Sequence, residues 1–342
     1  MADWSSRDPG TPARWDDAHA HIIGEVPLYL REDEVKSLLT MDLTLTALEA
    51  AFREWAAGRA VNQPRRRVAA GTVLATMSAA LPSKGLLGFK AYTAGRQGAR
   101  FWVALFDSGS GQPRALMEAD WLGRMRTGAA SGLATKYLAR DDAVILTIIG
   151  SGTQALTQVL AVSAVRRLTE VRVFSPNREH RAAFVEQLAG QLPPSIRVLS
   201  ASDLQSSLDG TDVITTITSA SRPFLAGQWV APGQHLNVCG SNLPSHREID
   251  GRALARADLV VADDVEAARL EAGDLIMAEQ EGLWKWAGVH SLREAVAGLV
   301  SRRQPSDVTL FKSVGLALED VAVAAAVLEL AEERQVGRRL SD

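Results

Sequence analysis

The residues best suited to chemistry form a glycine-rich turn near the middle of the chain. Residues 150–155 read Gly-Ser-Gly-Thr-Gln-Ala, with an apolar, β-branched stretch at 143–147 before them and apolar side chains at helical spacing over 156–168 after them. A strand, a glycine turn and a helix in this order, with the spacing G-x-G-x-x-A, form the dinucleotide-binding fingerprint. An ordinary tight turn between a strand and a helix is the alternative.

Each residue of this turn has a physical task in the fingerprint. Gly150 permits the tight turn, and Gly152 lets the backbone approach a pyrophosphate. The free N–H groups at the start of the helix attract the anion. We therefore predict that Gly150, Gly152, Thr153 and Gln154 bind a dinucleotide cofactor.

The residues after the next strand indicate which dinucleotide. NAD-binding units usually carry Asp or Glu at the end of this strand, where it binds the ribose 2′-hydroxyl. Here the strand 170–175 ends at Ser175, followed by Pro176, Asn177 and Arg178. No carboxylate repels a 2′-phosphate, and a guanidinium can bind one bidentately. We expect Ser175, Asn177 and Arg178 to bind NADP(H) in preference to NAD(H). Binding of NAD(H) stays possible if Arg178 is an ordinary solvated side chain.

The surrounding pattern is typical of an α/β fold. Short apolar strands are expected at 212–217, 235–238 and 259–263, and helical stretches separate them, which predicts a doubly wound parallel sheet. Upstream and downstream of this sheet, the pattern predicts helices at 41–57, 126–138 and 318–333 and β-like segments at 67–70, 72–77, 86–92, 101–107 and 113–117.

Composition narrows the class of protein. The 342 residues suffice for two domains, and 46% hydrophobic and 23% charged residues are ordinary for a globular protein. A net charge of −3 gives no general attraction to nucleic acid. The single cysteine, Cys239, and six scattered histidines argue against a disulfide framework and against a bound metal.

The ends of the chain and its apolar stretches bear on location. No run of about 18 apolar residues is present, and the N-terminus lacks the layout of a signal peptide. We expect a cytoplasmic protein that does not bind membranes. Residues 1–20 are polar and rich in helix-breaking residues, so we expect a disordered extension.

Several segments, in order and in register, resemble the ornithine cyclodeaminase/mu-crystallin family. They are Gly-Phe-Lys at 88–90, Arg-Thr-Gly-Ala-Ala at 126–130, the glycine turn at 150–155, Gly-Gln-His-Leu-Asn at 233–237, residues 240–250, Phe-Lys-Ser-Val-Gly at 311–315, and Glu-Asp at 319–320. The resemblance covers the chain from about residue 28 to the end of the last helix.

The resemblance implies a fold of two domains. A Rossmann dinucleotide-binding domain would span 126–317. An N-terminal α/β domain, formed by 21–125 and closed by the C-terminal helix within 318–342, would bind substrate and make a homodimer. Members of the family use a nicotinamide cofactor on small amino acids or their imines.

The resemblance also assigns site residues. Lys90 falls near the substrate carboxylate and the reacting centre, and Arg66, in a Pro-x-Arg segment, would pair with that carboxylate. Two further positions beside the substrate would be Met77 and Val314. The implied cofactor-binding residues are Arg126 and Thr127 at a helix start near the phosphates, Thr216 and Thr218 beside the nicotinamide ribose, and Ser313 near the nicotinamide.

At one position the residue differs from the one found in ornithine cyclodeaminases, the enzymes after which the family is named. Ornithine cyclodeaminases carry an aspartate, thought to handle protons, where this chain has Asn242. Asparagine can orient a substrate or water by hydrogen bonds, but it cannot act as a base. We therefore list Asn242 with Lys90 as a catalytic candidate, and the departure favours simple reduction of a C=N bond or the reverse oxidation.

The sequence thus predicts an NAD(P)H-dependent oxidoreductase acting on the carbon–nitrogen bond of an amino or imino acid. Hydride would pass between the cofactor and the α-carbon, with the carboxylate held by Arg66 and Lys90. Two alternatives stay open: an ammonia-eliminating cyclodeaminase with tightly bound NAD, and an NADP(H)-dependent protein that binds a small ligand without chemistry.

Overall fold

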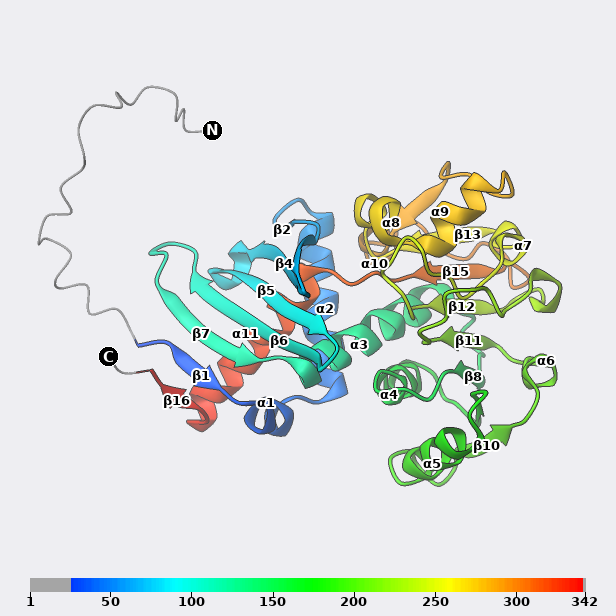
Figure 1. The fold of residues 1–342 in the computed structure, drawn as a ribbon, viewed down its shortest axis with the longest axis horizontal. Coiled ribbons are helices and arrows are strands. Elements are labelled where there is room, and N and C mark those ends of the chain that lie inside the picture. The colour runs from blue at the N-terminus through cyan, green and yellow to red at the C-terminus, as the bar shows by residue number, and fades with distance from the viewer. Residues whose placement is uncertain (1–25, 341–342) are drawn as a thin grey trace, which may run out of the picture.

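The computed structural model describes residues 26–340 as two sheets that lie side by side, each with its own helices (Figure 1). Helix α3, Asp120–Leu138, runs between the two sheets and contacts both. The predicted disordered extension at 1–20 lies outside the described residues. The predicted domain boundary at 125 and 126 falls inside α3, and the exact division of the chain into domains stays a prediction.

The first sheet is mostly antiparallel. Its strands pair in the order β16-β1-β7-β6-β5-β4-β2, and β3 pairs with β4. The bounds are β1 Leu28–Leu30, β2 Val61–Asn62, β3 Arg66–Ala70, β4 Thr72–Leu81, β5 Leu86–Gly95, β6 Gly98–Asp107, β7 Pro113–Glu118 and β16 Arg338–Arg339. The predicted β-like segments are therefore strands, each of them longer than the pattern indicated.

The alternation of side chains in β5 decides which face of this sheet is buried. Leu86, Gly88 and Lys90 point inward, and Leu87 and Phe89 are exposed on the other face. The inward face packs against helix α11, Ala317–Arg334. A Cβ on Gly88 would lie 2.5 Å from the carbonyl oxygen of the neighbouring strand, so only glycine allows this close approach.

Helices α1 and α2 complete the first half of the molecule. They span Glu32–Leu38 and Met41–Ala56, and α2 packs against both α11 and α3. Because α11 comes from the end of the chain and covers the first sheet, the C-terminal helix closes the N-terminal part of the fold as predicted.

The second sheet is the predicted doubly wound parallel sheet. Its strands pair in the order β10-β9-β8-β11-β12-β15-β13-β14, and every pair is parallel. The strands are β8 Ile145–Ile149, β9 Glu170–Phe174, β10 Arg197–Ala201, β11 Val213–Thr216, β12 His235–Val238, β13 Leu259–Ala262, β14 Val289–Ser291 and β15 Thr309–Lys312. The helices are α4 Ala155–Val165, α5 Arg178–Ala189, α6 Leu204–Ser207, α7 Gly251–Ala255, α8 Val265–Glu271, α9 Gly273–Gln280 and α10 Leu292–Val296.

Parallel pairing brings the ends of these strands to one edge. The loops after β8, β11, β12, β13 and β15 therefore begin next to one another, at the carboxyl edge where doubly wound sheets bind ligands. The strand order reverses between β8 and β11, and the glycine turn at 150–155 leaves the sheet at that point.

Helix α3 begins six residues earlier than predicted, at Asp120 instead of Arg126. Its first N–H groups, those of Asp120 and Trp121, donate to the carboxylate of Glu32, nearly 90 residues earlier in the chain. A cap supplied from so far away leaves no local signal. Arg126 and Thr127 consequently lie inside the helix, and the predicted position at a helix start is wrong.

Within residues 26–340, no helix is long and apolar enough to cross a membrane.

The crossing of α3 and α4 gives a stability test. A Cβ on Gly128 of α3 would lie 2.3 Å from the carbonyl oxygen of Thr157 in α4, whereas a Cβ on Gly190 would find its nearest neighbour at 3.6 Å. We expect Gly128→Ala to lower the free energy of unfolding by about 1–3 kcal/mol through overpacking. Gly190→Ala should change it by less than about 0.5 kcal/mol. Urea unfolding followed by circular dichroism measures both, and equal effects would contradict this account of the crossing.

Candidate active site

A cavity of about 540 Å³ lies between the two halves of the molecule, at the carboxyl edge of the parallel sheet. The first half contributes residues just before and on β3–β6, and the second half contributes loops that follow its strands. The lining residues are Arg65, Arg67, Val73, Lys90, Tyr92, Ala94, Ala99 and Phe101 from the first half, Arg126 and Thr127 from α3, and Gln154, Ile217, 239–243 and 313–315 from the second.

The glycine turn has the geometry that a dinucleotide needs. Gly150 has φ +119°, and a Cβ there would lie 2.4 Å from the carbonyl oxygen of Ile217, so only glycine fits. A Cβ on Gly152 would have no atom within 4 Å, which leaves its backbone open to a ligand. Thr153 is exposed at the same turn. Gln154 lines the cavity, and its Oε1 is buried without a hydrogen-bond partner. The turn and α4 behind it therefore fit a pyrophosphate.

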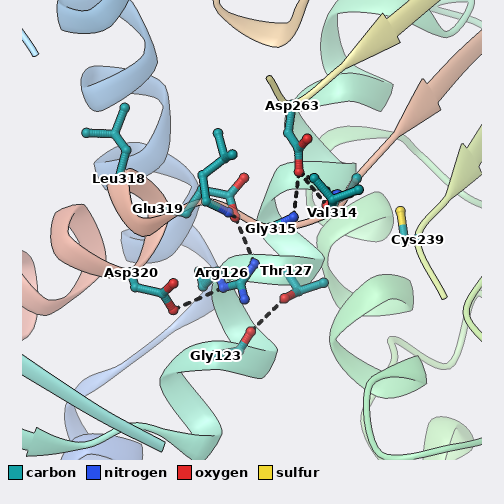
Figure 2. A network of polar contacts seen from close by, with 12 residues as sticks. Gly123, Arg126, Thr127, Cys239, Asp263, Val314, Gly315, Leu318, Glu319 and Asp320 are labelled. Carbon is teal, nitrogen blue, oxygen red and sulfur yellow. Dashed lines mark hydrogen bonds and ion pairs between the residues drawn. The ribbon is translucent and has the colours of Figure 1, made fainter. Parts of the chain in front are cut away.

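Lys90 and Arg126 line the cavity and form three buried ion pairs with two carboxylates behind them. Figure 2 shows the two ion pairs of Arg126. Lys90 Nζ lies 2.8 Å from Asp320 Oδ1, and Arg126 Nε donates to the same oxygen at 3.1 Å. Arg126 Nη1 donates to Glu319 Oε2 at 2.8 Å. All four side chains are at most 10% exposed, and the two carboxylates come from the first turn of α11. We call these four residues the floor cluster.

Burial perturbs the acid–base behaviour of the floor cluster. Desolvation lowers the pKa of Lys90 to about 8, although the neighbouring Asp320 carboxylate opposes the shift. Desolvation raises the pKa of Glu319 to about 8, although Arg126 opposes that shift. Burial therefore disfavours the charged form of both side chains, and the opposite charges beside them restore part of it. Asp320 Oδ2 and Glu319 Oε1 are buried without hydrogen-bond partners.

Among the three consecutive arginines at 65–67, those that line the cavity are not the one that was predicted to bind substrate. Arg65 and Arg67 line the cavity, and both donate to the carboxylate of Glu271 at the end of α8. Arg65 Nη2 also donates to the carbonyl oxygens of Val314 and Gly315, each at 3.1 Å. Arg66 is exposed and does not line the cavity, because alternate residues of an extended chain point to opposite sides. The candidate carboxylate-binding arginine is therefore corrected from Arg66 to Arg65.

Asn242 lies on a tightly held loop after β12. Its side chain lines the cavity and is half-buried, and its carbonyl oxygen accepts from Arg67 at 3.3 Å. The loop is anchored from behind. Gly240 N–H donates to Glu248, and Lys312 Nζ donates to the carbonyl oxygen of Ser241.

Four hydroxyls predicted to bind cofactor already donate their protons inside the protein. Thr216 and Thr218 donate to the buried carboxylate of Glu248, at 2.7 and 2.8 Å. Ser313 donates to Asp263 at 3.0 Å, and Thr127 donates to the carbonyl oxygen of Gly123 at 2.7 Å. Each oxygen can therefore only accept from a ligand, which suits a ribose hydroxyl or a carboxamide N–H and does not suit a phosphate oxygen.

Asp263, at the end of β13, shapes the loop that faces the glycine turn. It accepts from the N–H groups of Val314 and Gly315, each at 2.7 Å, as Figure 2 shows. Burial raises the pKa of this carboxyl. Gly315 has φ +81°, and a Cβ there would lie 2.6 Å from Arg126 Nη1. Asp263 and Gly315 therefore hold Val314, a predicted substrate contact, at the cavity wall.

The remaining predicted residues lie at different depths. Met77 faces Lys90 across β4 and β5, but it is only 4% exposed, lies in the hydrophobic core and is not among the residues that line the cavity. At the end of β9, Ser175 is buried and its carbonyl oxygen accepts from Arg181. Asn177 Oδ1 caps α5 by accepting from His180 N–H, and Arg178 is exposed beside it.

Sequence reasoning missed several residues of the site. These are Arg65, Arg67, Glu271, Glu248, Asp263, Glu319 and Asp320. Asp263 could have been found from its place after a parallel strand, because that edge binds ligands. Glu319 and Asp320 were noted as a segment that carries the resemblance, but no site role was assigned to them. Two consecutive acids at a helix start are typical of an exposed first turn, so the pattern gave no sign of their burial.

Comparison with known proteins agrees with the resemblance. Residues 25–335 match the ornithine cyclodeaminase/mu-crystallin family. A Delta(1)-pyrroline-2-carboxylate reductase of Bacillus cereus is 35% identical, over 92% of this chain and 99% of its own length. The rat ketimine reductase mu-crystallin is 32% identical, over 89% of this chain and 97% of its own.

Solved structures share the whole fold. Thermococcus litoralis Delta(1)-pyrroline-2-carboxylate reductase, in complex with NADH and L-proline, superposes with a TM-score of 0.87 at 32% identity, covering 92% of this chain and 100% of that one. An archaeal alanine dehydrogenase dimer with bound NAD gives a TM-score of 0.86 at 32% identity, covering 92% and 99%. The chain belongs to the ornithine cyclodeaminase/mu-crystallin family.

Proposed function

We propose that this protein is an NAD(P)H-dependent oxidoreductase that reduces the C=N bond of an α-imino acid to an amino acid. The observation that carries the proposal is that Lys90, Arg126 and Arg65 line the same cavity as Gln154 of the glycine turn. The names of the relatives, a Delta(1)-pyrroline-2-carboxylate reductase, a ketimine reductase and an alanine dehydrogenase, support the same reaction class.

The cations position the substrate carboxylate. Lys90 and Arg65 lie close enough for the charge of Arg65 to act on Lys90, and Arg126 acts on it more strongly. Arg65 Nε is buried without a partner, so it keeps a donor for a ligand. We assign binding of the substrate carboxylate to Arg65, Lys90 and Arg126. Arg126 is no longer assigned to the cofactor phosphates, because its guanidinium is held by Glu319 and Asp320.

Reduction needs a hydride and a proton. A bound nicotinamide cofactor, held by the glycine turn, would supply the hydride to the α-carbon. Lys90 is the proton donor to nitrogen in this proposal, because it is buried, points into the cavity and has a pKa near neutrality. Asp320 holds the ammonium in place through its 2.8 Å contact. Asn242 would orient the substrate or a water by hydrogen bonds.

The geometry favours reduction over cyclisation with loss of ammonia. None of the acidic side chains within residues 26–340 lines the cavity, and position 242 carries an amide. Cyclisation needs a proton acceptor beside the substrate amine, and an amide cannot serve. Ammonia release from ornithine without added cofactor would favour the cyclodeaminase alternative. Tight NADPH binding with no reduction of any imino acid would favour the ligand-binding alternative.

For the cofactor, we propose that NADP(H) is preferred over NAD(H). The end of β9 carries no acidic side chain over 174–178, and Arg178 is exposed with no hydrogen bond or ion pair to the described residues. A guanidinium that is free and exposed is available for a 2′-phosphate. The relatives with bound cofactor contain NADH or NAD, so binding measurements decide between the two.

We further propose that the protein is a homodimer joined through the outer face of the first sheet. Val68, Leu74, Leu87 and Phe89 are exposed there, with Phe89 stacked on Phe106 at 6.0 Å. Four large apolar side chains on one sheet face indicate a covered surface. The alanine dehydrogenase relative is a dimer. The cytoplasmic location stays a prediction from the sequence.

Replacing Lys90 tests the proton donor. Lys90→Met should lower kcat/KM for imino-acid reduction by about 10²–10⁴-fold while NADPH binding persists. In the wild type, kcat/KM should fall as the pH rises through about 8, because only protonated Lys90 can donate. Steady-state NADPH oxidation from about pH 6 to pH 10 measures this. A flat profile, or an active Lys90→Met, would show that another group donates the proton.

Replacing Arg178 tests the cofactor preference. Arg178→Gln should weaken NADPH binding by roughly 10-fold or more, the value of one charge-assisted contact, and leave NADH binding unchanged. Isothermal titration with each dinucleotide measures both constants. A wild type that binds NADH more tightly than NADPH would refute the preference.

A charge on the outer sheet face tests the dimer. Phe89→Asp should give a monomer by light scattering, because a buried, unpaired carboxylate is costly at an interface. Leu299→Asp is the matched control, since Leu299 is 73% exposed outside the first sheet. A wild-type monomer, or dissociation by both variants, would contradict the assigned face.

A further inference from the structure

The cavity carries more positive charge than one carboxylate requires. Four cations line it: Arg65, Arg67, Lys90 and Arg126. A substrate with a single carboxylate and a neutral side chain needs the inner part of this set alone, as assigned above. Arg67 therefore has no role in the proposed binding of the α-carboxylate.

The carboxylates in contact with these four cations do not neutralise all of their positive charge. Glu271 is shared between Arg65 and Arg67, and Asp320 is shared between Lys90 and Arg126. Glu319 is the third carboxyl in contact, so four cations face three carboxyls. Asp263 lies nearby, but its hydrogen bonds go to Ser313 and to backbone N–H groups.

Arg67 occupies a distinct place in the cavity. Its side chain is 31% exposed, against 3% for Arg65, so it stands nearer the solvent. Arg67 extends from β3 and donates two hydrogen bonds to the second half of the molecule. Its Nη1 donates to Glu271 Oε1 at 2.5 Å, and its Nη2 donates to the carbonyl oxygen of Asn242 at 3.3 Å. These two contacts use two of the five N–H groups of a guanidinium. The rest remain for a ligand that lies between the inner cations and Arg67.

We propose that Arg67 is a specificity-determining residue that binds a second carboxylate of the substrate, so that the site prefers dicarboxylic α-imino acids. Arg65, Lys90 and Arg126 bind the α-carboxylate in this arrangement, and Arg67 binds the carboxylate at the end of the side chain. A planar guanidinium suits this task because it pairs with a carboxylate bidentately. The inference rests on the proposed function and narrows its substrate class.

The reaction balances without a further reagent. The imine carbon gains a hydride from NADPH, the C=N double bond becomes a single bond, and the nitrogen gains a proton from Lys90, which water then restores. NADPH leaves as NADP⁺. The second carboxylate takes no part in the bond changes, so its contact with Arg67 changes substrate preference and not the chemistry.

A substrate comparison tests the inference on the full chain with NADPH. The pair is oxaloacetate with ammonia, which forms a dicarboxylic imine, against pyruvate with ammonia, which forms a monocarboxylic one. We expect kcat/KM for oxaloacetate to exceed that for pyruvate by about 10-fold or more. Arg67→Gln should remove about 10- to 100-fold of the rate with oxaloacetate and change the rate with pyruvate by less than about 3-fold. Arg66→Gln, the neighbouring arginine outside the cavity, is the matched control and should change neither rate.

A binding measurement gives a readout that does not depend on turnover. With the NADPH-loaded enzyme, succinate should bind more tightly than propionate, and Arg67→Gln should abolish the difference. Equal preference for mono- and dicarboxylic substrates, or an Arg67→Gln variant that loses both rates equally, would overturn the inference and leave the proposed reductase in place. No reduction of either imine or of Delta(1)-pyrroline-2-carboxylate would instead overturn the proposed function.

Discussion

The burial of the floor cluster is the constraint on which the site depends. Lys90 and Arg126 lie against Glu319 and Asp320 with almost no exposure to water, and isolated charges at such depth would cost several kcal/mol each. The pairing compensates the charges, and it also fixes the fold. Lys90 comes from β5, Arg126 from α3 and the two acids from α11, so the end of the chain has to return to the first sheet before the cluster is complete.

Buried carboxylates hold the opposite wall in the same way. Asp263 accepts from the N–H groups of the loop after β15, and Glu248 accepts from the loops after β11 and β12. Loops at the carboxyl edge have few backbone partners of their own, and fixed acceptors replace those partners. These anchored loops position Val314 and Asn242 at the cavity wall.

The fold could be predicted further than the site. The parallel sheet, the glycine turn and a helix at 318–333 follow from local patterns, and the structure confirms them. That this helix closes the first half of the molecule was implied by the family resemblance. The side of the chain on which an arginine points could not be predicted, because three consecutive arginines carry no signal of register and a shift of one residue exchanges Arg66 for Arg65. The start of α3 was missed because Glu32 caps it from a distant segment. The hydroxyls of Thr216, Thr218 and Ser313 were assigned to cofactor without knowledge of the acids that accept their protons.

The central claim is that hydride passes directly from the nicotinamide to the α-carbon of an imino acid held over Lys90. NADPH stereospecifically deuterated at C4 on the transferred face, mixed with an α-keto acid and ammonia, tests it by proton NMR and mass spectrometry of the amino-acid product. The account predicts one deuterium at the α-carbon, stoichiometric with oxidised cofactor. An amino acid without deuterium from either C4-deuterated NADPH, or ammonia release from a diamino acid with no change in the cofactor, would contradict it.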